Sequence, residues 1–346
     1  MLKLKKPPRL KAGDRVAIVS PSSGMAGDAP FLWRYRQGCE RLRTVFGLEP
    51  VEMPYTLAGS DAVYRHPEKR AEDLMRAFSD PTIRAIIPVI GGNDSVRMLP
   101  YIDFNVIRDN PKVVTGYSDS TVLHFMCMKA GLASFYGLNV MCDLAENVHM
   151  SGYTVEYVKK ALFSAGPVGE VRVSDEWTDE YLPWEEKNRN RQRVFRPNTG
   201  YELLQGTRSA RGALIGGCME VMSTLIATPL FPPAEAFDGA FLFLETSEVE
   251  PPVWLMEDML RHLGTMGLLS RLNGLVFGKP IYARFYEEYK PVIRRVLAEF
   301  GRGDLPVLYN ASFGHNEPKC LLPYGAEAEI CCAPPGFAVR ETATRA

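Results

Sequence analysis

The sequence predicts an α/β protein with a doubly wound, mostly parallel N-terminal domain followed by a β-rich α/β C-terminal domain. Three observations lead to this prediction. Short apolar runs alternate with segments of helical spacing, the runs are continuously apolar, and they resume beyond a charged, irregular stretch near the middle of the chain. Continuous apolar strands separated by helices are typical of a parallel sheet that is covered on both faces.

In the first half of the sequence, predicted strands alternate with predicted helices. Strands are expected at 14–20, at 83–90 and in the apolar run before Gly116, and helices at 31–46, 69–78, about 95–99 and 121–129. Ligands of such sheets bind beyond the carboxyl ends of the strands. The Gly91-Gly92 turn and Ser118 both follow a strand, so they are expected to share one crevice.

A stretch crowded with charge, residues 175–211, separates the two halves. It is too long and irregular for a simple connection, and we interpret it as a functional loop or a mobile linker. Beyond it, residues 211–217 open the second domain, in which strands are expected at 240–244, 274–277 and 306–309, and helices at 254–263 and 286–300. The predicted parts are an N-terminal domain (1–165), a connecting and substrate loop region (166–210) and a C-terminal domain (211–346).

Composition and charge narrow the classes of function. The 346 residues carry a formal net charge of −1, which gives no reason to expect a nucleic-acid polymer as partner. No apolar run approaches the roughly 20 residues that cross a bilayer, and the first residues lack the features of a signal peptide. The seven cysteines are scattered and do not have metal-ligand spacing. We expect a cytoplasmic protein with no metal or other cofactor and no membrane partner.

Ser118 is the first candidate for chemistry. It stands between an apolar run and a helical pattern, in the turn Gly116-Tyr117-Ser118-Asp119. Hydrolases present a nucleophilic serine on such a turn, where the hydroxyl is exposed near the amides of a helix start. The alternative is that Ser118 only caps the helix, since serine is preferred there. Ser120 replaces the second glycine of the α/β-hydrolase motif, so that fold is not expected.

A nucleophilic serine needs a base, usually a histidine oriented by a carboxylate. Among the five histidines, His315 stands out because it follows a predicted buried strand directly. Glu245 ends a strongly apolar run, where a carboxylate needs a partner such as an imidazole N–H. The alternatives are that His315 is structural or on the surface, and that Glu245 forms a strand-end salt bridge. Together, Ser118, Glu245 and His315 are better explained as the catalytic residues of a serine hydrolase than as three unrelated polar residues at strand ends.

An oxyanion formed at the substrate carbonyl needs backbone N–H donors. The Gly91-Gly92 turn can supply one, because glycine lets the backbone approach a ligand closely. The amide of Asp119, directly after the serine, can supply another. A phosphate-binding role of the two glycines has weak support, because neither the GxGxxG nor the GxxxxGK pattern is present.

These motifs resemble the LD-carboxypeptidase family of serine peptidases. The likeness spans nearly the whole chain, and the turns at 116–119 and 91–92 are its most specific parts. Further matching motifs lie at 19–23, 216–217, 242–245 and 314–315. The resemblance implies that Ser118 is the nucleophile, Glu245 the orienting acid and His315 the base, meeting at the interface of two domains. It also implies a homodimer without a metal.

Two branches of this family differ in substrate. LD-carboxypeptidases remove the terminal D-alanine of murein tetrapeptides. The MccF-like branch, that of the microcin C self-immunity proteins, is similar to amidases that cut an aminoacyl group from a nucleotide-like moiety. Residues 176–188 look like the extra loop of this second branch, with Trp184 as the candidate to stack on the nucleobase. Trp177 and Asn93 are further candidates for substrate contact. Alternatively, both tryptophans anchor the loop to the body or to a dimer partner.

The leading hypothesis is a serine carboxypeptidase or amidase that hydrolyses the amide bond of aminoacyl- or peptidyl-nucleotide analogues, as in microcin C-type detoxification. Its substrates are expected to be small amides with a free acid end. One alternative is a murein tetrapeptide LD-carboxypeptidase. The other is a non-catalytic nucleotide- or peptide-binding protein, in which Ser118 is only a cap. Cys218 follows Gly216-Gly217 and has no assigned role.

Overall fold

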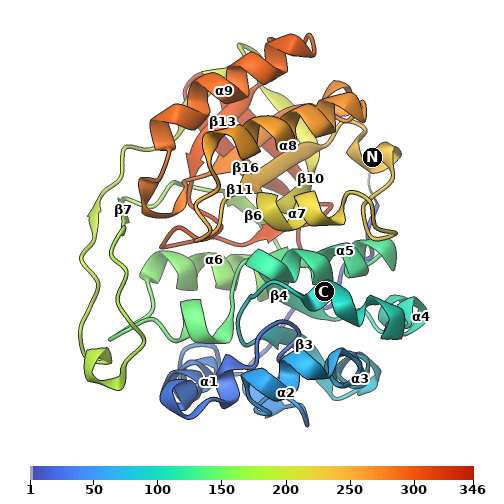
Figure 1. Cartoon of the computed structure of the whole chain (residues 1–346), viewed down its shortest axis with the longest axis vertical. Coiled ribbons are helices and arrows are strands. Elements are labelled where there is room, and N and C mark those ends of the chain that lie inside the picture. Colours follow the sequence, from blue (N-terminus) through green and yellow to red (C-terminus); the bar gives the residue numbers. More distant parts are fainter. Residues whose placement is uncertain (1–2) are drawn as a thin grey trace.

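Two sheets, one in each half of the chain, organise the structure. The computed structural model describes residues 3–346, and within this range the strands form a six-stranded sheet, an eight-stranded sheet and a two-stranded ribbon. The first sheet lies in the lower half of Figure 1 and the second in the upper half, with α5 (Thr121–Lys129) and α6 (Gly152–Leu162) between them. The expected α/β fold with two domains is confirmed.

The first sheet is mostly parallel, as expected. Its strand order is β14-β5-β4-β3-β1-β2, and all neighbours run parallel except β14, which pairs antiparallel with β5 at one edge. The strands are β1 (Arg15–Val19), β2 (Glu49–Glu52), β3 (Ile83–Pro88), β4 (Val113–Gly116), β5 (Phe135–Tyr136) and β14 (Leu322–Pro323). The residues of β1, β3 and β4 are nearly all buried, which explains their continuously apolar sequence.

Helices cover both faces of this sheet. They are α1 (Leu32–Phe46), α2 (Ser60–Arg65), α3 (Pro67–Ser79), α4 (Phe104–Asp109), α5 and α6, with the 3-10 segment η4 (Ser118–Ser120) and the π-helical segment η5 (Val140–Leu144). The chain steps from β1 to β2 and then back past β1 to β3, β4 and β5. Right-handed connections therefore place α1 on one face and α3, α4 and α5 on the other. The reversal opens a crevice at the carboxyl ends of β1 and β3, where ligands bind in such sheets.

One expected helix has a different form. The segment expected to be helical over about 95–99 is the 3-10 segment η3 (Ser95–Tyr101), which contains Pro100. Proline lacks an amide N–H, and its ring collides with the preceding turn of an α-helix, so a regular α-helix cannot continue through it. The helices expected at 31–46, 69–78 and 121–129 are present as α1, α3 and α5.

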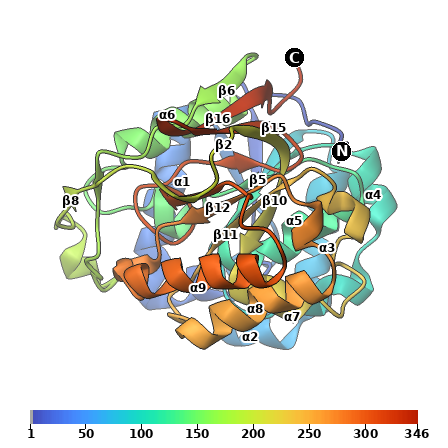
Figure 2. The same cartoon turned by 90° about the horizontal axis from the view of Figure 1, so that it is seen from above.

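The second sheet has a parallel centre and antiparallel flanks. Its order is β6-β16-β15-β10-β11-β12-β13-β9, and β10 to β13 run parallel. The strands are β6 (Pro167–Glu170), β9 (Glu202–Gln205), β10 (Ala210–Cys218), β11 (Phe241–Glu245), β12 (Gly274–Gly278), β13 (Val307–Ala311), β15 (Glu327–Cys332) and β16 (Pro335–Thr342). The accompanying helices are α7 (Met219–Leu225), α8 (Val253–Thr265) and α9 (Tyr286–Glu299). Figure 2 shows α8 and α9 side by side along this sheet.

The charged middle of the chain forms a loop that reaches the first domain. It leaves β7 (Glu176–Trp177), turns at η6 (Glu186–Asn188) and returns through β8 (Arg196–Pro197), at the left of Figure 1. At the turn, Arg189 Nε donates to Oε1 of Gln37 in α1 at 3.0 Å. We call residues 178–195 the cavity loop, because several of them line the cavity described below.

A single hydrophobic core runs through both domains. Buried side chains of β1 and β3 belong to the same cluster as those of β11 and β12. The strand β14, which follows the second domain's last parallel strand in the sequence, pairs with β5 of the first sheet and so ties the two domains together. None of the helices within residues 3–346 has both the length and the apolar character needed to cross a membrane.

Candidate active site

Ser118 lies on the sharp turn between β4 and α5. Its φ is +63°, a left-handed conformation that residues other than glycine seldom adopt. Two contacts hold the backbone there: Thr121 Oγ1 donates to the Ser118 carbonyl at 2.7 Å, and the Ser118 N–H donates to the Tyr136 hydroxyl at 3.2 Å. A strained turn of this kind presents a serine hydroxyl above the end of a strand, as nucleophiles of hydrolases are presented.

Ser118 does not cap a helix. The residues at the N-cap positions of η4 and α5 are Tyr117 and Ser120, and neither side chain makes a capping hydrogen bond. The side chain of Ser118 instead faces a cavity, although only 8% of the residue is exposed. The hydroxyl is therefore available for chemistry.

The loop after β3 brings Gly91 and Gly92 beside Ser118. A Cβ at Gly91 would lie 2.8 Å from Ser118 Cβ and 2.9 Å from its Oγ, so a residue with a side chain does not fit there. Within residues 3–346, the amide N–H groups of Gly91 and Gly92 make no hydrogen bond. The amide of Asp119 is in the first turn of η4, where N–H groups have no partner within the helix. These amides can donate to an oxyanion.

The carboxylate of Asp119 fixes this turn to the neighbouring loops. Its Oδ2 accepts from the Ser95 N–H at 2.9 Å and from the Ser22 hydroxyl, while Ser95 Oγ donates to the Asp119 carbonyl at 3.1 Å. Ser22 follows β1 and Ser95 follows β3. The position of the Asp119 amide is thereby tied to both loops at the carboxyl edge of the sheet.

Glu245 and His315 form a hydrogen-bonded pair from the second domain. Glu245 ends β11 and is 2% exposed, and its Oε2 lies 2.7 Å from His315 Nδ1 and accepts from the His315 N–H at 3.1 Å. Gly314 has φ +86°, and a Cβ there would lie 2.5 Å from Glu245 Cγ. Only glycine therefore lets the His315 loop approach the carboxylate this closely. The partner of Glu245 is the imidazole rather than an arginine or a lysine.

Tyr136 connects this pair to Ser118. Its fully buried hydroxyl donates to Glu245 Oε1 at 2.5 Å and accepts from the Ser118 N–H. A series of hydrogen bonds thus connects the serine turn of the first domain, through Tyr136, to Glu245 and His315 of the second. Sequence reasoning did not single out Tyr136, because a tyrosine in a short apolar segment carries no signal of this contact.

A second carboxylate contacts His315. Glu248 Oε2 lies 3.2 Å from His315 Nε2, and the Glu248 side chain is 65% exposed. Burial of the ring opposes protonation, but the two nearby carboxylates outweigh it and raise the pKa of His315 to about 10 from its ordinary value of 6.5. Sequence reasoning also missed Glu248, since only the course of the loop after β11 turns it toward the imidazole.

These residues meet at a cavity of about 450 Å³ between the domains and the cavity loop. Its lining includes Ser118, His315, Gly91 and Gly92, together with Trp184 of the cavity loop. The Arg34 guanidinium carbon lies 4.3 Å from the centre of the Trp184 ring. The guanidinium is fixed by the Met141 carbonyl at 2.6 Å and by Asn147 Oδ1 at 2.7 Å. Trp184 thus stands at the cavity with a cation over its ring.

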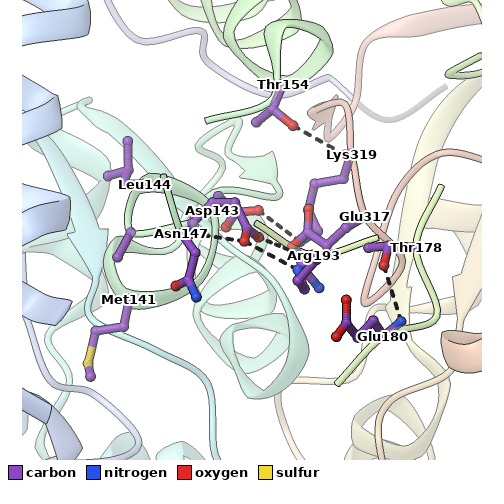
Figure 3. A network of polar contacts seen from close by, with 12 residues as sticks. Met141, Asp143, Leu144, Asn147, Thr154, Thr178, Glu180, Arg193, Glu317 and Lys319 are labelled. Atoms are coloured by element: carbon purple, nitrogen blue, oxygen red, sulfur yellow. Dashed lines mark hydrogen bonds and ion pairs between the residues drawn. The ribbon is translucent and has the colours of Figure 1, made fainter. Parts of the chain in front are cut away.

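A network of polar and charged side chains connects the cavity loop with both domains (Figure 3). Lys319 is fully buried, and its Nζ donates to Asp143 Oδ1 at 2.8 Å and to Glu317 Oε1 at 2.5 Å. The Glu317 carbonyl accepts from the Thr178 N–H at 3.1 Å, and Arg193 forms an ion pair with Glu146. The His315 segment, the first domain and the cavity loop are therefore joined by one polar network.

Two residues expected to contact the substrate, Asn93 and Trp177, lie outside the cavity lining within the described range 3–346. Trp177 packs beside Lys279, whose Nζ lies 4.5 Å from the ring centre. Cys218 is buried, its Sγ is 3.4 Å from Glu220 Oε2, and it does not line the cavity either. His124 is a core residue: it contacts Ser134 and Gly116, and burial lowers its pKa to about 4.

With this geometry in view, comparison with known proteins identifies the family. A model of the LD-carboxypeptidase N-terminal domain matches residues 16–137, and a model of the LD-carboxypeptidase C-terminal domain matches residues 211–330. The chain belongs to the LD-carboxypeptidase family. The likeness in sequence is confirmed, and the two matched regions contain Ser118 and Glu245 with His315, respectively.

The names of the matched relatives include both a self-immunity protein and a murein carboxypeptidase. The microcin self-immunity protein MccF of Escherichia coli is 26% identical over 79% of both chains. The murein tetrapeptide carboxypeptidase of Pseudomonas aeruginosa is 25% identical and covers 91% of this chain and 92% of its own. A crystal structure of an MccF-like protein from Streptococcus pneumoniae, in complex with AMP, is 32% identical, with a TM-score of 0.87 and coverage of 94% and 98%.

As a member of this peptidase family, the protein is an enzyme, a serine hydrolase of the carboxypeptidase type. The alternative of a non-catalytic binding protein is therefore wrong.

Proposed function

We propose that this enzyme is a serine amidase that hydrolyses the amide bond of aminoacyl- or peptidyl-nucleotide analogues, in the manner of microcin C detoxification. The observation that carries the proposal is the position of Trp184 in the same cavity as Ser118 and His315. An aromatic face in a cavity can stack on a nucleobase. The complex of the Streptococcus pneumoniae protein, 32% identical, with AMP supports a nucleotide as ligand.

In the proposed mechanism, Ser118 Oγ attacks the amide carbonyl while His315 Nε2 accepts its proton. His315 then gives this proton to the leaving nitrogen, and Glu245 orients the ring through Nδ1 and stabilises its charged form. The amides of Gly91 or Gly92 and of Asp119 donate to the oxyanion. Water then attacks the acyl-enzyme. His315 accepts the proton of this water and returns it to Ser118 Oγ as the ester bond breaks and the free acid leaves.

Each part of the chain has one task in this proposal. Residues 1–165 supply the nucleophile and the oxyanion amides, 166–210 supply the substrate loop with Trp184, and 211–346 supply the acid–base pair. Trp177 and Asn93, the other two candidates for substrate contact, do not line the cavity, and the proposed mechanism gives them no task.

The test is the Ser118→Ala variant, assayed with an aminoacyl-sulfamoyl adenosine. We expect turnover to fall at least about a thousandfold while the substrate still binds, because the variant removes the nucleophile and leaves the cavity. Ser120→Ala is the matched control: Ser120 Oγ is buried and makes no hydrogen bond within residues 3–346, so activity should persist. Normal turnover by Ser118→Ala would refute the proposed nucleophile.

A second candidate is hydrolysis of murein tetrapeptides, favoured by the Pseudomonas aeruginosa relative that is 25% identical. One enzyme preparation assayed on a murein tetrapeptide and on an aminoacyl-sulfamoyl adenosine separates the two. Release of D-alanine at a higher kcat/KM than cleavage of the nucleotide substrate would replace the first proposal by the second.

We also propose that the enzyme acts in the cytoplasm as a homodimer, as the family resemblance implies. Sedimentation equilibrium of the purified chain would measure its mass against the 38.7 kDa of one copy. A mass of one copy at micromolar concentration would contradict the dimer.

A further inference from the structure

Within residues 3–346, Glu248 is the one carboxylate that forms an ion pair with Nε2, the reactive nitrogen of His315. Because Nδ1 of His315 is occupied by Glu245, only Nε2 remains to exchange protons with Ser118 and with a leaving nitrogen. Glu248 Oε2 lies 3.2 Å from this Nε2 and faces the cavity. Its carboxylate therefore occupies space beside the position that the scissile bond must take.

The other acids of the cavity are already paired. Glu146 pairs with Arg193, Glu317 with Lys319, and Glu180 with Arg191. Glu248 differs: among residues 3–346 its single ion-pair partner is His315. Its side chain is also well exposed, on the loop between β11 and α8, so it can turn without disturbing packed structure.

A base must have a free lone pair on Nε2 to accept the proton of Ser118. The contact with Glu248 holds that nitrogen in its protonated form, as the donor of an ion pair. The carboxylate must therefore leave Nε2 before the reaction, and a substrate that offers it another cation favours this step.

We propose that Glu248 binds the α-ammonium group of the aminoacyl part of the substrate, and that this contact withdraws the carboxylate from His315. The inference rests on the proposed function, because in an aminoacyl amide the α-ammonium is attached to the carbon next to the scissile carbonyl. A cation held there reaches a carboxylate beside Nε2. Glu248 is thus a specificity residue: it selects a free amine on the acyl side.

The carboxylate of Glu248 is expected to disfavour the binding of a murein tetrapeptide. The D-alanine that a carboxypeptidase releases carries its own carboxylate one carbon from the leaving nitrogen. That nitrogen must approach His315 Nε2, so the two negative charges would come close together, which is unfavourable. A free acid end on the substrate is therefore compatible with Glu248 only at a distance from the bond that is cut.

Two substrates that differ only in the ammonium group test the inference. Alanyl-sulfamoyl adenosine carries the α-ammonium, and propionyl-sulfamoyl adenosine has hydrogen in its place. We expect the ratio of kcat/KM for alanyl over propionyl to fall about tenfold from the wild type to Glu248→Gln, the effect of losing one charged hydrogen bond. Glu248→Asp should keep most of the ratio, because the charge remains.

Glu250→Gln is the matched control. Glu250 lies on the same loop, pairs with Arg284 and does not line the cavity, so the ratio should equal that of the wild type. An equal ratio in the wild type and Glu248→Gln would overturn the inference while leaving the proposed function intact. If the wild type cleaves neither nucleotide substrate, the proposed function fails and the inference falls with it.

Discussion

His315 has a carboxylate at each ring nitrogen, Glu245 at Nδ1 and Glu248 at Nε2. The two have different exposure: Glu245 is buried in the wall between the domains, whereas Glu248 is open to water. The buried partner orients the ring permanently, and the exposed partner can be exchanged. Tyr117 packs edge-on against the ring, with centroids 5.0 Å apart, and restricts rotation of the imidazole.

This arrangement leads to a prediction on pH dependence. The charged groups that face His315 are Glu245 and Glu248, and both raise its pKa. The base must be neutral, so kcat/KM rises with pH as His315 loses its proton. Replacing Glu248 by Gln removes one stabilising negative charge and lowers the pKa of His315, so the rising limb should move to lower pH by about one unit.

The measurement is the pH profile of kcat/KM for the propionyl substrate, which does not contact Glu248 through an ammonium group. The shift between wild type and Glu248→Gln should shrink in high salt, because an exposed carboxylate is screened. A rising limb that stays in place or moves to higher pH would contradict the assignment of Glu248 as a partner of the base.

Tyr136 provides a second prediction for a single residue. Tyr136→Phe leaves Glu245 Oε1 and the Ser118 N–H without their shared partner. We expect a loss of about 1–3 kcal/mol in the free energy of unfolding, since buried polar groups are left unpaired, together with a lower kcat. Urea denaturation and steady-state kinetics measure the two effects. Tyr35→Phe, which removes a hydroxyl contact to Glu52 outside the cavity lining, should lower stability without lowering kcat. Equal kcat values in both variants would refute a positioning role.

At the scale of elements, the sequence predicted those with a strong periodic pattern and missed those that depend on neighbours. The helix expected at 121–129 is α5 with the same bounds, since apolar side chains and polar starting residues agree there. The last two strands, β15 and β16, were not predicted, and the ion pair of Glu329 with Arg340 that joins them connects residues from two separate strands. Such pairing is visible only after folding.

The candidate site shows the same division. Ser118, Glu245 and His315 stand at or just after strand ends, and this position together with their side-chain chemistry made them candidates. Trp184 and Trp177 are alike in sequence, seven residues apart on one charged stretch, and only the course of the cavity loop separates them. One lies at the cavity under Arg34 and the other packs beside Lys279. No local pattern distinguishes these two environments.

This pair of tryptophans permits a matched test of the cavity loop. Trp184→Ala should raise the KM of an aminoacyl-sulfamoyl adenosine roughly 5- to 150-fold, the effect of about 1–3 kcal/mol for one stacked base. The kcat should change less, since Trp184 does not touch the reacting atoms in the proposed mechanism. Trp177→Ala is the control and should leave KM near the wild-type value. A similar rise of KM in both variants would indicate that the tryptophans only anchor the loop.

At the scale of the whole molecule, the reaction depends on how firmly two domains are held together. Asp143 belongs to η5 of the first domain, whereas Lys319 follows His315 in the second, and neither side chain is exposed. Lys319 also stands over the Tyr117 ring, with Nζ 4.3 Å from its centre. One buried ammonium therefore contacts the serine turn, the segment η5 and the segment that carries His315.

A final prediction concerns this ammonium. Lys319→Met leaves Asp143 and Glu317 as buried carboxylates without their cation, and we expect a loss of about 3–5 kcal/mol in the free energy of unfolding. If the loss arises from an uncompensated charge, adding Asp143→Asn should restore part of it. The double variant would then be less destabilised than the sum of the two single variants. Urea denaturation of the wild type and the three variants measures this coupling. If the losses of the two single variants simply add in the double variant, Lys319 stabilises the domain contact by packing and not by its charge.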